Sequence, residues 1–185
     1  MNRVIVENQP SVLISIHPGW CEKIFDGSKT IELRKNEPDC EAPFRCFVYE
    51  TQGKTSTPWM DEDGHLIFRG RGMVIGEFIC DQIVRFDVPF PAYMEQVDTK
   101  LLKAACLSYR EAHAYLGHRS GKGWHITKPK LYDKPRPLTN FHRPCPNGLY
   151  CESCAMYQVR AHACGNYALE IKRPPQSWMY AEDQT

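Results

Sequence analysis

The hydrophobic and polar positions of the first 51 residues predict three strands and one helix. Residues 12–17 form an apolar run, which is typical of a buried strand. Pro18 then suits the first turn of a helix, and Gly27 is placed to end it. Residues 29–35 alternate between polar and apolar side chains, which predicts a second strand, and residues 44–51 predict a third. The chain is therefore expected to open as strand, helix, strand, strand.

The middle of the chain predicts a loop, a long strand and a pair of helices. Residues 52–71 hold Gly, Asp, Ser and Thr, and are typical of a long exposed loop. Residues 73–86 predict one bent strand or two shorter ones, with a bulge at Gly76. Residues 92–117 form the main helical region, in which the Ser108–Glu111 spacing predicts a capping box at the start of the second helix.

The last part of the chain returns to strand. Residues 123–133 predict a strand with an extended exit, and residues 166–182 predict a strand that runs into a double proline. Short strands dominate over few helices, which indicates an α+β fold. We expect a small mixed or antiparallel β-barrel with helices packed on it. The length suits a single domain over 1–185, with an insertion at about 140–166.

Charge narrows the classes of partner. The chain has 23 Lys and Arg against 22 Asp and Glu, which gives a formal net charge of +1. This balance excludes a nucleic-acid binder that works by bulk charge alone, but it allows a single basic groove. No apolar run approaches the roughly 20 residues of a membrane helix, and the first residues lack a secretory signal pattern. We therefore expect a cytoplasmic protein with no membrane partner.

Nine cysteines divide into two groups. Four of them lie within twenty residues, and a CxxC pair among them can hold one metal ion from a tight turn. Four thiolates would leave the metal no open position, so we predict a structural zinc site in the insertion. Reduced packing cysteines and a redox-sensitive CxxC are the alternatives, and His142 or His162 can replace an end ligand. The predicted zinc ligands are Cys145, Cys151, Cys154 and Cys164, whereas Cys21, Cys40, Cys46, Cys80 and Cys106 are scattered.

A row of polar side chains on the strand 29–35 is the main candidate for chemistry. Strand alternation places Thr30, Glu32 and Arg34 on one face, where a hydroxyl, a carboxylate and a guanidinium can contact a base edge or a phosphate. The alternative is that Glu32 and Arg34 neutralise each other. Lys29, at the preceding turn, is a candidate phosphate contact or catalytic base, or else a solvated turn lysine.

The closing segment supplies a second set of candidates. Gln176, Ser177 and Trp178 follow the double proline and present an amide, a hydroxyl and a large ring. Trp178 can stack on a base, or it can close one end of the barrel. Trp124 and His125 carry the same ambiguity. The sequence contains no nucleophile elbow, Walker loop, Rossmann glycine pattern or HExxH motif.

The segments ISIHPGWCEKIFDGSKTIELRK and RPPQSWMY, with VYET, GEF and GWHI between them, resemble the ASCH domain family of the PUA-like superfamily. The likeness covers most of residues 12–180 and is strongest to longer, phage- or prophage-associated members, whose cysteine insert resembles RPCPNGLYCESC. It implies a PUA-like barrel that binds RNA or nucleotides in a cleft beside the barrel. Some members are amidohydrolases on N4-acylated cytidines and at least one is a ribonuclease. The amidohydrolase branch has Thr where this chain has Glu32, three residues after Lys29.

Three functions follow as hypotheses. The preferred one is a domain that binds RNA or a nucleotide in a cleft built from the KTIELR strand and the RPPQSW loop. The second is a hydrolase acting on a modified nucleoside or RNA, with Lys29 and Glu32 as catalytic candidates. The third is an interaction module whose partner surface is the cysteine insertion and the 52–71 loop.

Overall fold

The structure is a computed structural model of the 185-residue chain. It describes residues 10–52, 59–60, 66–67, 70–88, 97–117, 119–145 and 167–184. The helices are α1 (Pro18–Phe25), α2 (Thr99–Ala104) and α3 (Tyr109–Leu116), with short 3-10 turns η2 (Leu138–Asn140) and η4 (Tyr167–Leu169). The strands are β1 (Val12–Ile16), β2 (Ile31–Arg34), β3 (Phe44–Glu50), β4 (Trp59–Met60), β5 (Leu66–Ile67), β6 (Met73–Phe86), β7 (Gly121–Arg136), β8 (Phe141–His142), β9 (Trp178–Tyr180) and β10 (Glu182–Asp183).

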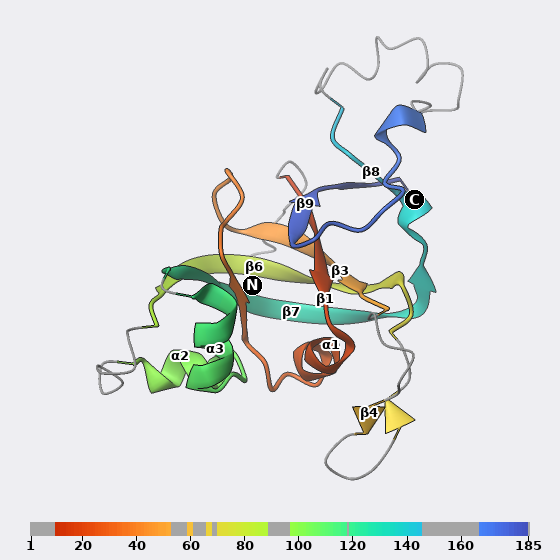
Figure 1. The fold of residues 1–185 in the computed structure, drawn as a ribbon. Helices are drawn as coiled ribbons and strands as arrows, with labels where there is room; N and C mark the ends of the chain where they lie inside the picture. Colours follow the sequence, from red (N-terminus) through yellow and green to blue (C-terminus); the bar gives the residue numbers. More distant parts are fainter. Residues whose placement is uncertain are drawn as a thin grey trace, which may run out of the picture.

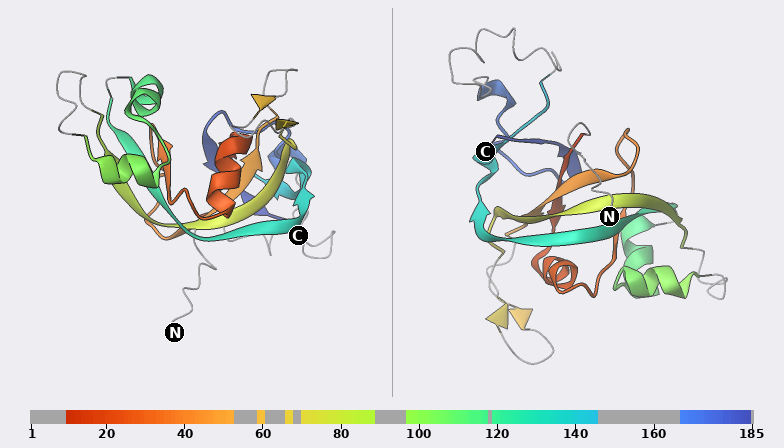
Figure 2. Two further views of the ribbon diagram at one scale, coloured as in Figure 1. Left: turned by 90° about the horizontal axis from the view of Figure 1, so that it is seen from below. Right: turned by 180° about the vertical axis from the view of Figure 1, so that it is seen from behind.

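A six-stranded mixed sheet forms the body of the molecule (Figure 1). Its strand order is β2-β7-β6-β3-β1-β9, and within it β1 pairs with β3 in parallel while the other pairs are antiparallel. The long strands β6 and β7 curve the sheet into a half-barrel, and α1 and the α2–α3 pair rise from its concave side (Figure 2). The predicted α+β fold, a mixed β-barrel carrying helices, is therefore confirmed.

Helix ends follow the signals in the sequence. Asp98 caps α2 by accepting from the backbone N–H groups of residues 100 and 101. Ser108 and Glu111 form the predicted capping box at the start of α3, and Gly117 ends that helix with a positive φ of 65°. These residues define where α2 begins and where α3 begins and ends, and α3 lines the cleft described below.

Buried side chains gather in three clusters around the sheet. The largest lies between the sheet and α1, where Trp124 and Phe44 pack edge to face at 5.4 Å between ring centroids. A second cluster joins β2 to α2 and α3 through Ile31, Leu33 and Leu116. α1 and the α2–α3 pair are therefore packed on the same sheet, each over its own hydrophobic cluster.

Gly76 allows α1 to approach the sheet. A Cβ atom there would lie 2.5 Å from the Lys130 carbonyl oxygen and 2.6 Å from Cζ of Phe25, so only glycine fits. The β6–β7 register shifts between Val74 and Gly76, which confirms the predicted irregularity. The stretch 73–86 is one bent strand.

The structure corrects several predicted elements. The strand predicted over 29–35 begins only at Ile31. The stretch 52–71 was expected to be a loop but contains the paired strands β4 and β5. The strand expected before the double proline is wrong: the described residues there form η4 and a single bridge at Glu170, and the strand β9 follows the prolines. Proline lacks the N–H that a strand ladder needs, so this segment pairs with β1 only beyond Pro175.

No helix among the described residues is long and apolar enough to cross a membrane. Of the predicted zinc ligands, Cys151, Cys154 and Cys164 lie outside the described residues. The structure therefore leaves the zinc site as a prediction.

Candidate functional site

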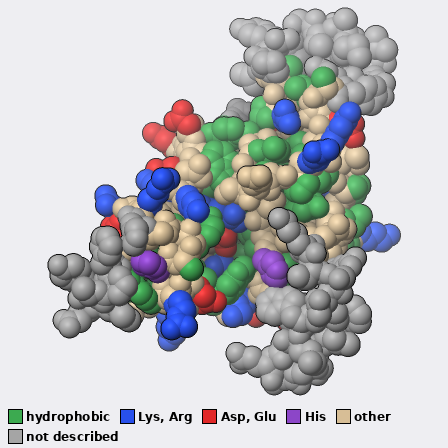
Figure 3. Space-filling model, viewed as in Figure 1, with side chains coloured by type: hydrophobic (Ala, Val, Ile, Leu, Met, Phe, Trp, Pro, Cys, Tyr) green, Lys and Arg blue, Asp and Glu red, His purple; other side chains and the backbone are tan. Residues whose placement is uncertain are grey.

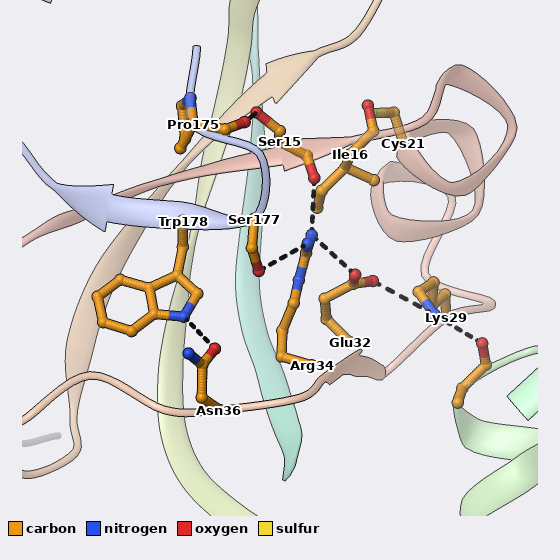
Figure 4. A network of polar contacts seen from close by, with 11 residues as sticks. Ser15, Ile16, Cys21, Lys29, Glu32, Arg34, Asn36, Pro175, Ser177 and Trp178 are labelled. Atoms are coloured by element: carbon orange, nitrogen blue, oxygen red, sulfur yellow. Dashed lines mark hydrogen bonds and ion pairs between the residues drawn. The ribbon is translucent and has the colours of Figure 1, made fainter. Parts of the chain in front are cut away.

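Two charged side chains project from one face of β2. Ile31 and Leu33 point into the core beneath α2 and α3, and alternation turns Glu32 and Arg34 to the opposite face. Both are nonetheless buried, with 7% of Glu32 and 6% of Arg34 exposed. Arg34 Nη2 lies 3.0 Å from Glu32 Oε1, so the carboxylate and the guanidinium form a buried ion pair (Figure 4).

Lys29 joins this pair from outside the strand. Because β2 begins at Ile31, the backbone at Lys29 is free to turn its side chain inward, and only 2% of the residue is exposed. Its Nζ lies 3.4 Å from Glu32 Oε2 and donates to the Ala105 carbonyl oxygen at 2.6 Å. Strict strand alternation would have placed Lys29 opposite Glu32. The structure instead produces a row of three charges, Lys29, Glu32 and Arg34.

Lys29 also ties the row to the helices. The last carbonyls of α2 lack intrahelical partners, and Ala104 accepts from the Thr30 backbone N–H at 2.9 Å while Ala105 accepts from Lys29 Nζ. The Lys29 ammonium lies 5.0 Å from the centroid of the Trp20 ring on α1. The charged row is thereby fixed between α1 on one side and α2 on the other.

Arg34 connects the two edges of the sheet. Its Nη2 donates to the Ser15 carbonyl oxygen on β1 at 2.7 Å, and its Nη1 lies 3.5 Å from Ser177 Oγ, just before β9 (Figure 4). Ser15 in turn donates from Oγ to the Pro175 carbonyl oxygen at 2.6 Å. Side chains thus bridge β2 and β9, the two outer strands of the half-barrel, at the position of the charged row.

A cleft of about 540 Å³ opens over this row, between α1 and α3. Figure 3 shows acidic and basic side chains together in the hollow between α1 and the α2–α3 pair. Lys29, Glu32 and Arg34 lie among its lining residues. The other lining residues are Ser15, Ile16, His17, Trp20, Leu33, Leu107, Glu111, Ala114 and Tyr115.

Positive charge exceeds negative charge at the base of the cleft. Two buried cations, Lys29 and Arg34, share one carboxylate, Glu32. Within the described part of the chain, Glu32 Oε2 and Arg34 Nε have no hydrogen-bond partner. Buried polar atoms are normally paired, so Arg34 Nε favours a ligand with a hydrogen-bond acceptor and Glu32 Oε2 favours one with a donor. The excess of one cation over one carboxylate favours a ligand that carries negative charge.

An aromatic ring with a lysine beside it lies on each wall. Trp20 on α1 has Lys23 Nζ at 5.1 Å from its ring centroid, and Tyr115 on α3 has Lys35 Nζ at 5.1 Å. Lys23 and Lys35 are exposed, and Tyr115 is 39% exposed. The cleft therefore combines flat apolar walls, positive charge at both rims and a charged base.

Glu111 contributes the acidic group of the α3 wall. Its side chain accepts from the Ser108 backbone N–H at 2.8 Å and from Ser108 Oγ at 2.7 Å. These hydrogen bonds lower the pKa of Glu111, with smaller contributions from Lys23 and Lys29. Glu111 is thus held as a carboxylate by its capping role.

The closing segment is divided between the cleft and the core. Ser177 contacts Arg34, but Gln176 is exposed and is not among the lining residues. Trp178 belongs to β9, packs against Trp124 at 5.9 Å between ring centroids, and donates from Nε1 to Asn36 Oδ1 at 3.0 Å. It lies beyond Arg34 from Lys29 (Figure 4), in the packing position that was the alternative to base stacking.

Thr30, Trp124 and His125 lie apart from the charged row. Thr30 precedes β2 and is exposed, so it does not join Glu32 and Arg34. Trp124 is fully buried in the core, and His125 Nδ1 pairs with Asp81 Oδ1 at 2.7 Å on the outer surface. His17 lines the cleft.

Three of the five scattered cysteines are packed in the core. Cys21, Cys46 and Cys80 are buried, and desolvation raises the pKa of each thiol, that of Cys80 to about 12. A thiol with so high a pKa is a poor nucleophile. Cys145, the first predicted zinc ligand, is half-buried and has a free thiol. Across the described ranges, no group of three or more His, Cys, Asp or Glu side chains is arranged to hold a metal ion.

Trp20, Tyr115 and Glu111 are cleft residues that the sequence did not single out as such. Neither Trp20 nor Tyr115 belongs to a motif that points to a binding site. Their only signal is amphipathic spacing: each lies at the edge of a helical face whose centre is buried, Cys21 and Ile24 in α1 and Ala112 and Leu116 in α3.

Comparison with solved structures identifies the fold. The chain is similar to the crystal structure of ASCH from Zymomonas mobilis, with a TM-score of 0.53 and 20% identity over 92% of this chain and 86% of that chain. Two mutants of the same protein give TM-scores of 0.55 and 0.54 at 18% and 19% identity, and cover 94% of this chain and 89% and 91% of theirs. This chain has the fold of an ASCH domain. No protein-family model matches its sequence, and no curated protein matches it.

The likeness confirms the predicted fold. At 18–20% identity it concerns the fold alone.

Proposed function

We propose that the cleft between α1 and α3 binds single-stranded nucleic acid, with RNA as the natural probe. A phosphate oxygen fits the excess positive charge of Lys29 and Arg34 at the base of the cleft. The rings of Trp20 and Tyr115 supply stacking surfaces for bases. The observation that carries the proposal is the buried row in which two cations share the Glu32 carboxylate beneath an open cleft.

The volume of the cleft and the net charge of the chain are compatible with a nucleic-acid ligand. A volume of about 540 Å³ lies within the range of small-molecule sites. A single basic groove is compatible with the net charge of +1, because it needs only a few placed cations. The family resemblance raises the same expectation, a ligand bound in a cleft beside the barrel.

Tyr115 offers the cleanest test because its exposure allows substitution without disturbing the core. A labelled single-stranded RNA of about six nucleotides is titrated at about 50 mM salt, where phosphate contacts are strong. Tyr115→Ala should weaken binding by about 5- to 150-fold, the equivalent of 1–3 kcal/mol for one stacked base. Tyr115→Phe keeps the ring and should bind like the wild type.

The exposed Arg85→Ala variant controls for a general loss of charge, since Arg85 pairs with Asp87 outside the cleft. Wild-type protein that fails to bind RNA at this salt concentration would overturn the proposal. So would a Tyr115→Ala variant that binds as tightly as the wild type.

A hydrolase is the second candidate, and the contact between Lys29 and Glu32 favours it. Glu32 Oε2 lies 3.4 Å from Lys29 Nζ, and within the described residues it accepts no hydrogen bond. A carboxylate so placed can take a proton from water while the ammonium stabilises the negative charge that develops on an attacked acyl or phosphoryl group. For an acylated base, the water oxygen bonds to the acyl carbon, the C–N bond breaks and the departing nitrogen takes the proton.

This candidate predicts that the purified protein releases product from N4-acylated cytidine or from RNA, and that Glu32→Gln abolishes the reaction. Mass spectrometry after prolonged incubation at high enzyme concentration measures it. Unchanged substrates would exclude hydrolysis of these compounds and leave the binding proposal intact.

A further inference from the structure

The rims of the cleft carry a feature that the base of the cleft does not explain. Lys23 and Lys35 are exposed, yet each lies over an aromatic ring on an opposite wall. Lys23 extends from α1 and Lys35 follows β2, so the two ammonium groups come from different elements. Lys29 and Arg34 line the cleft, and Lys23 and Lys35 lie beside two aromatic rings that line it, so four cations lie in or next to the cleft.

We infer that the cleft binds an internal segment of a single strand, with three consecutive phosphates, and not a free nucleotide or a strand end. The inference rests on the proposed function and specifies its substrate class. The central phosphate contacts the charged row, and the phosphates before and after it contact Lys23 and Lys35.

The chemistry of each rim supports this arrangement. A lysine ammonium has three rotatable donors on a flexible stem, so it can leave a ring and meet a phosphate at little cost. An incoming base then stacks on the ring that the ammonium has left, which conserves the apolar contact. A mononucleotide can use only one of the two rims, whereas a continuous strand uses both.

Glu111 restricts where the phosphates of the bound strand can lie. It lies on the α3 wall, its carboxylate is kept ionised by Ser108, and it is close enough to Lys23 and Lys29 for their charges to lower its pKa. A phosphate next to the Glu111 carboxylate would be repelled. The strand is therefore expected to place its sugar and base toward Glu111 and its phosphates toward Lys23 and Lys35.

The salt dependence of binding counts the phosphates. For single strands the slope of log K against log salt is about −0.7 for each phosphate neutralised. Three phosphates predict an affinity loss of about 18-fold between about 50 and 200 mM salt. Lys23→Ala or Lys35→Ala should each reduce this loss to about 7-fold, and the double variant to about 3-fold.

The experiment titrates wild type and these variants with a six-nucleotide RNA, its DNA equivalent and a mononucleotide at four salt concentrations. Lys130→Ala, at an exposed lysine of β7 that lies opposite Glu77 of β6, is the matched control and should keep the wild-type slope. Lys23→Ala and Lys35→Ala should each make the slope of log K against log salt shallower by the same amount. The mononucleotide should show the shallowest slope. The DNA arm reports whether the 2′-hydroxyl contributes.

Two failures are distinguishable. If RNA does not bind, the proposed function fails together with the inference. If RNA binds and Tyr115→Ala weakens it, but both rim variants keep the wild-type slope, the inference is overturned while the proposed function stands. A mononucleotide that binds as tightly as the six-nucleotide strand would also overturn it.

Discussion

Replacing Glu32 by glutamine tests the buried charged row directly. The substitution keeps the size of the side chain but removes the charge that Lys29 and Arg34 share. It leaves two cations buried at the base of the cleft without a counter-charge. The folded state should therefore lose stability, because removing one partner of a buried ion pair strands the other.

The magnitude follows from the distances. At an effective dielectric constant of about 20, ion pairs at 3.0 and 3.4 Å are worth about 5 kcal/mol each. The variant no longer bears the cost of burying the carboxylate, which offsets several kcal/mol of that sum. Lys29 keeps its hydrogen bond to Ala105, and Arg34 keeps its bond to Ser15. We therefore expect a net loss of about 3 kcal/mol, or roughly 6–12 °C in Tm.

Thermal and urea unfolding followed by circular dichroism measure the loss. Asp81→Asn is the matched control: its pair with His125 has 43% and 40% of the two side chains exposed, and should contribute less than about 1 kcal/mol. A phosphate-bearing ligand should stabilise Glu32→Gln more than the wild type, since the variant has greater positive charge at the base. A Glu32→Gln variant whose free energy of unfolding lies within about 1 kcal/mol of the wild type would refute the reasoning.

Three further predictions concern packing, capping and metal. Gly76→Ala should cost about 1–3 kcal/mol in urea unfolding, because its Cβ would overlap the ring of Phe25; unchanged stability would contradict the close approach. Ser108→Ala should cost about 1 kcal/mol at pH 7. Ser108 Oγ also donates to the Glu111 carboxylate, whose pKa is lowered, so this part of the contribution is present above about pH 4.5 and is lost as the pH falls through the folded pKa. The difference between wild type and variant should therefore narrow in acid, and a constant difference would argue against it. Elemental analysis should find one zinc per chain, lost in Cys154→Ser, and a zinc-free wild type would remove the predicted site.

Strand periodicity predicted the part of the site that a local rule determines. Residues two apart on a strand share a face, so Glu32 and Arg34 were expected together, and the structure places them together. The same rule placed Lys29 on the face opposite Glu32, and it placed Thr30 on the same face as Glu32 and Arg34. Both placements are wrong, because the strand begins only at Ile31. Where a strand starts depends on its partner strand, β7 here, and the sequence of β2 alone does not contain that information.

The walls of the cleft depend on tertiary packing. Trp20 and Tyr115 are 95 positions apart in sequence and meet across the cleft only because their helices pack on the same concave sheet. Capping signals predicted where α3 starts and ends, yet no local pattern fixes the angle at which it stands. For Trp178 the sequence left two possibilities open, base stacking and closing one end of the barrel. Pairing of β9 with β1 places the ring against the core cluster, a position that depends on tertiary packing.

A structure of the protein bound to a short single-stranded RNA is the most direct test of the proposed function. Such a structure should show a phosphate within hydrogen-bonding distance of Lys29 Nζ or the Arg34 guanidinium, with a base against Tyr115. RNA bound on another face of the molecule, with the cleft between α1 and α3 empty, would contradict it.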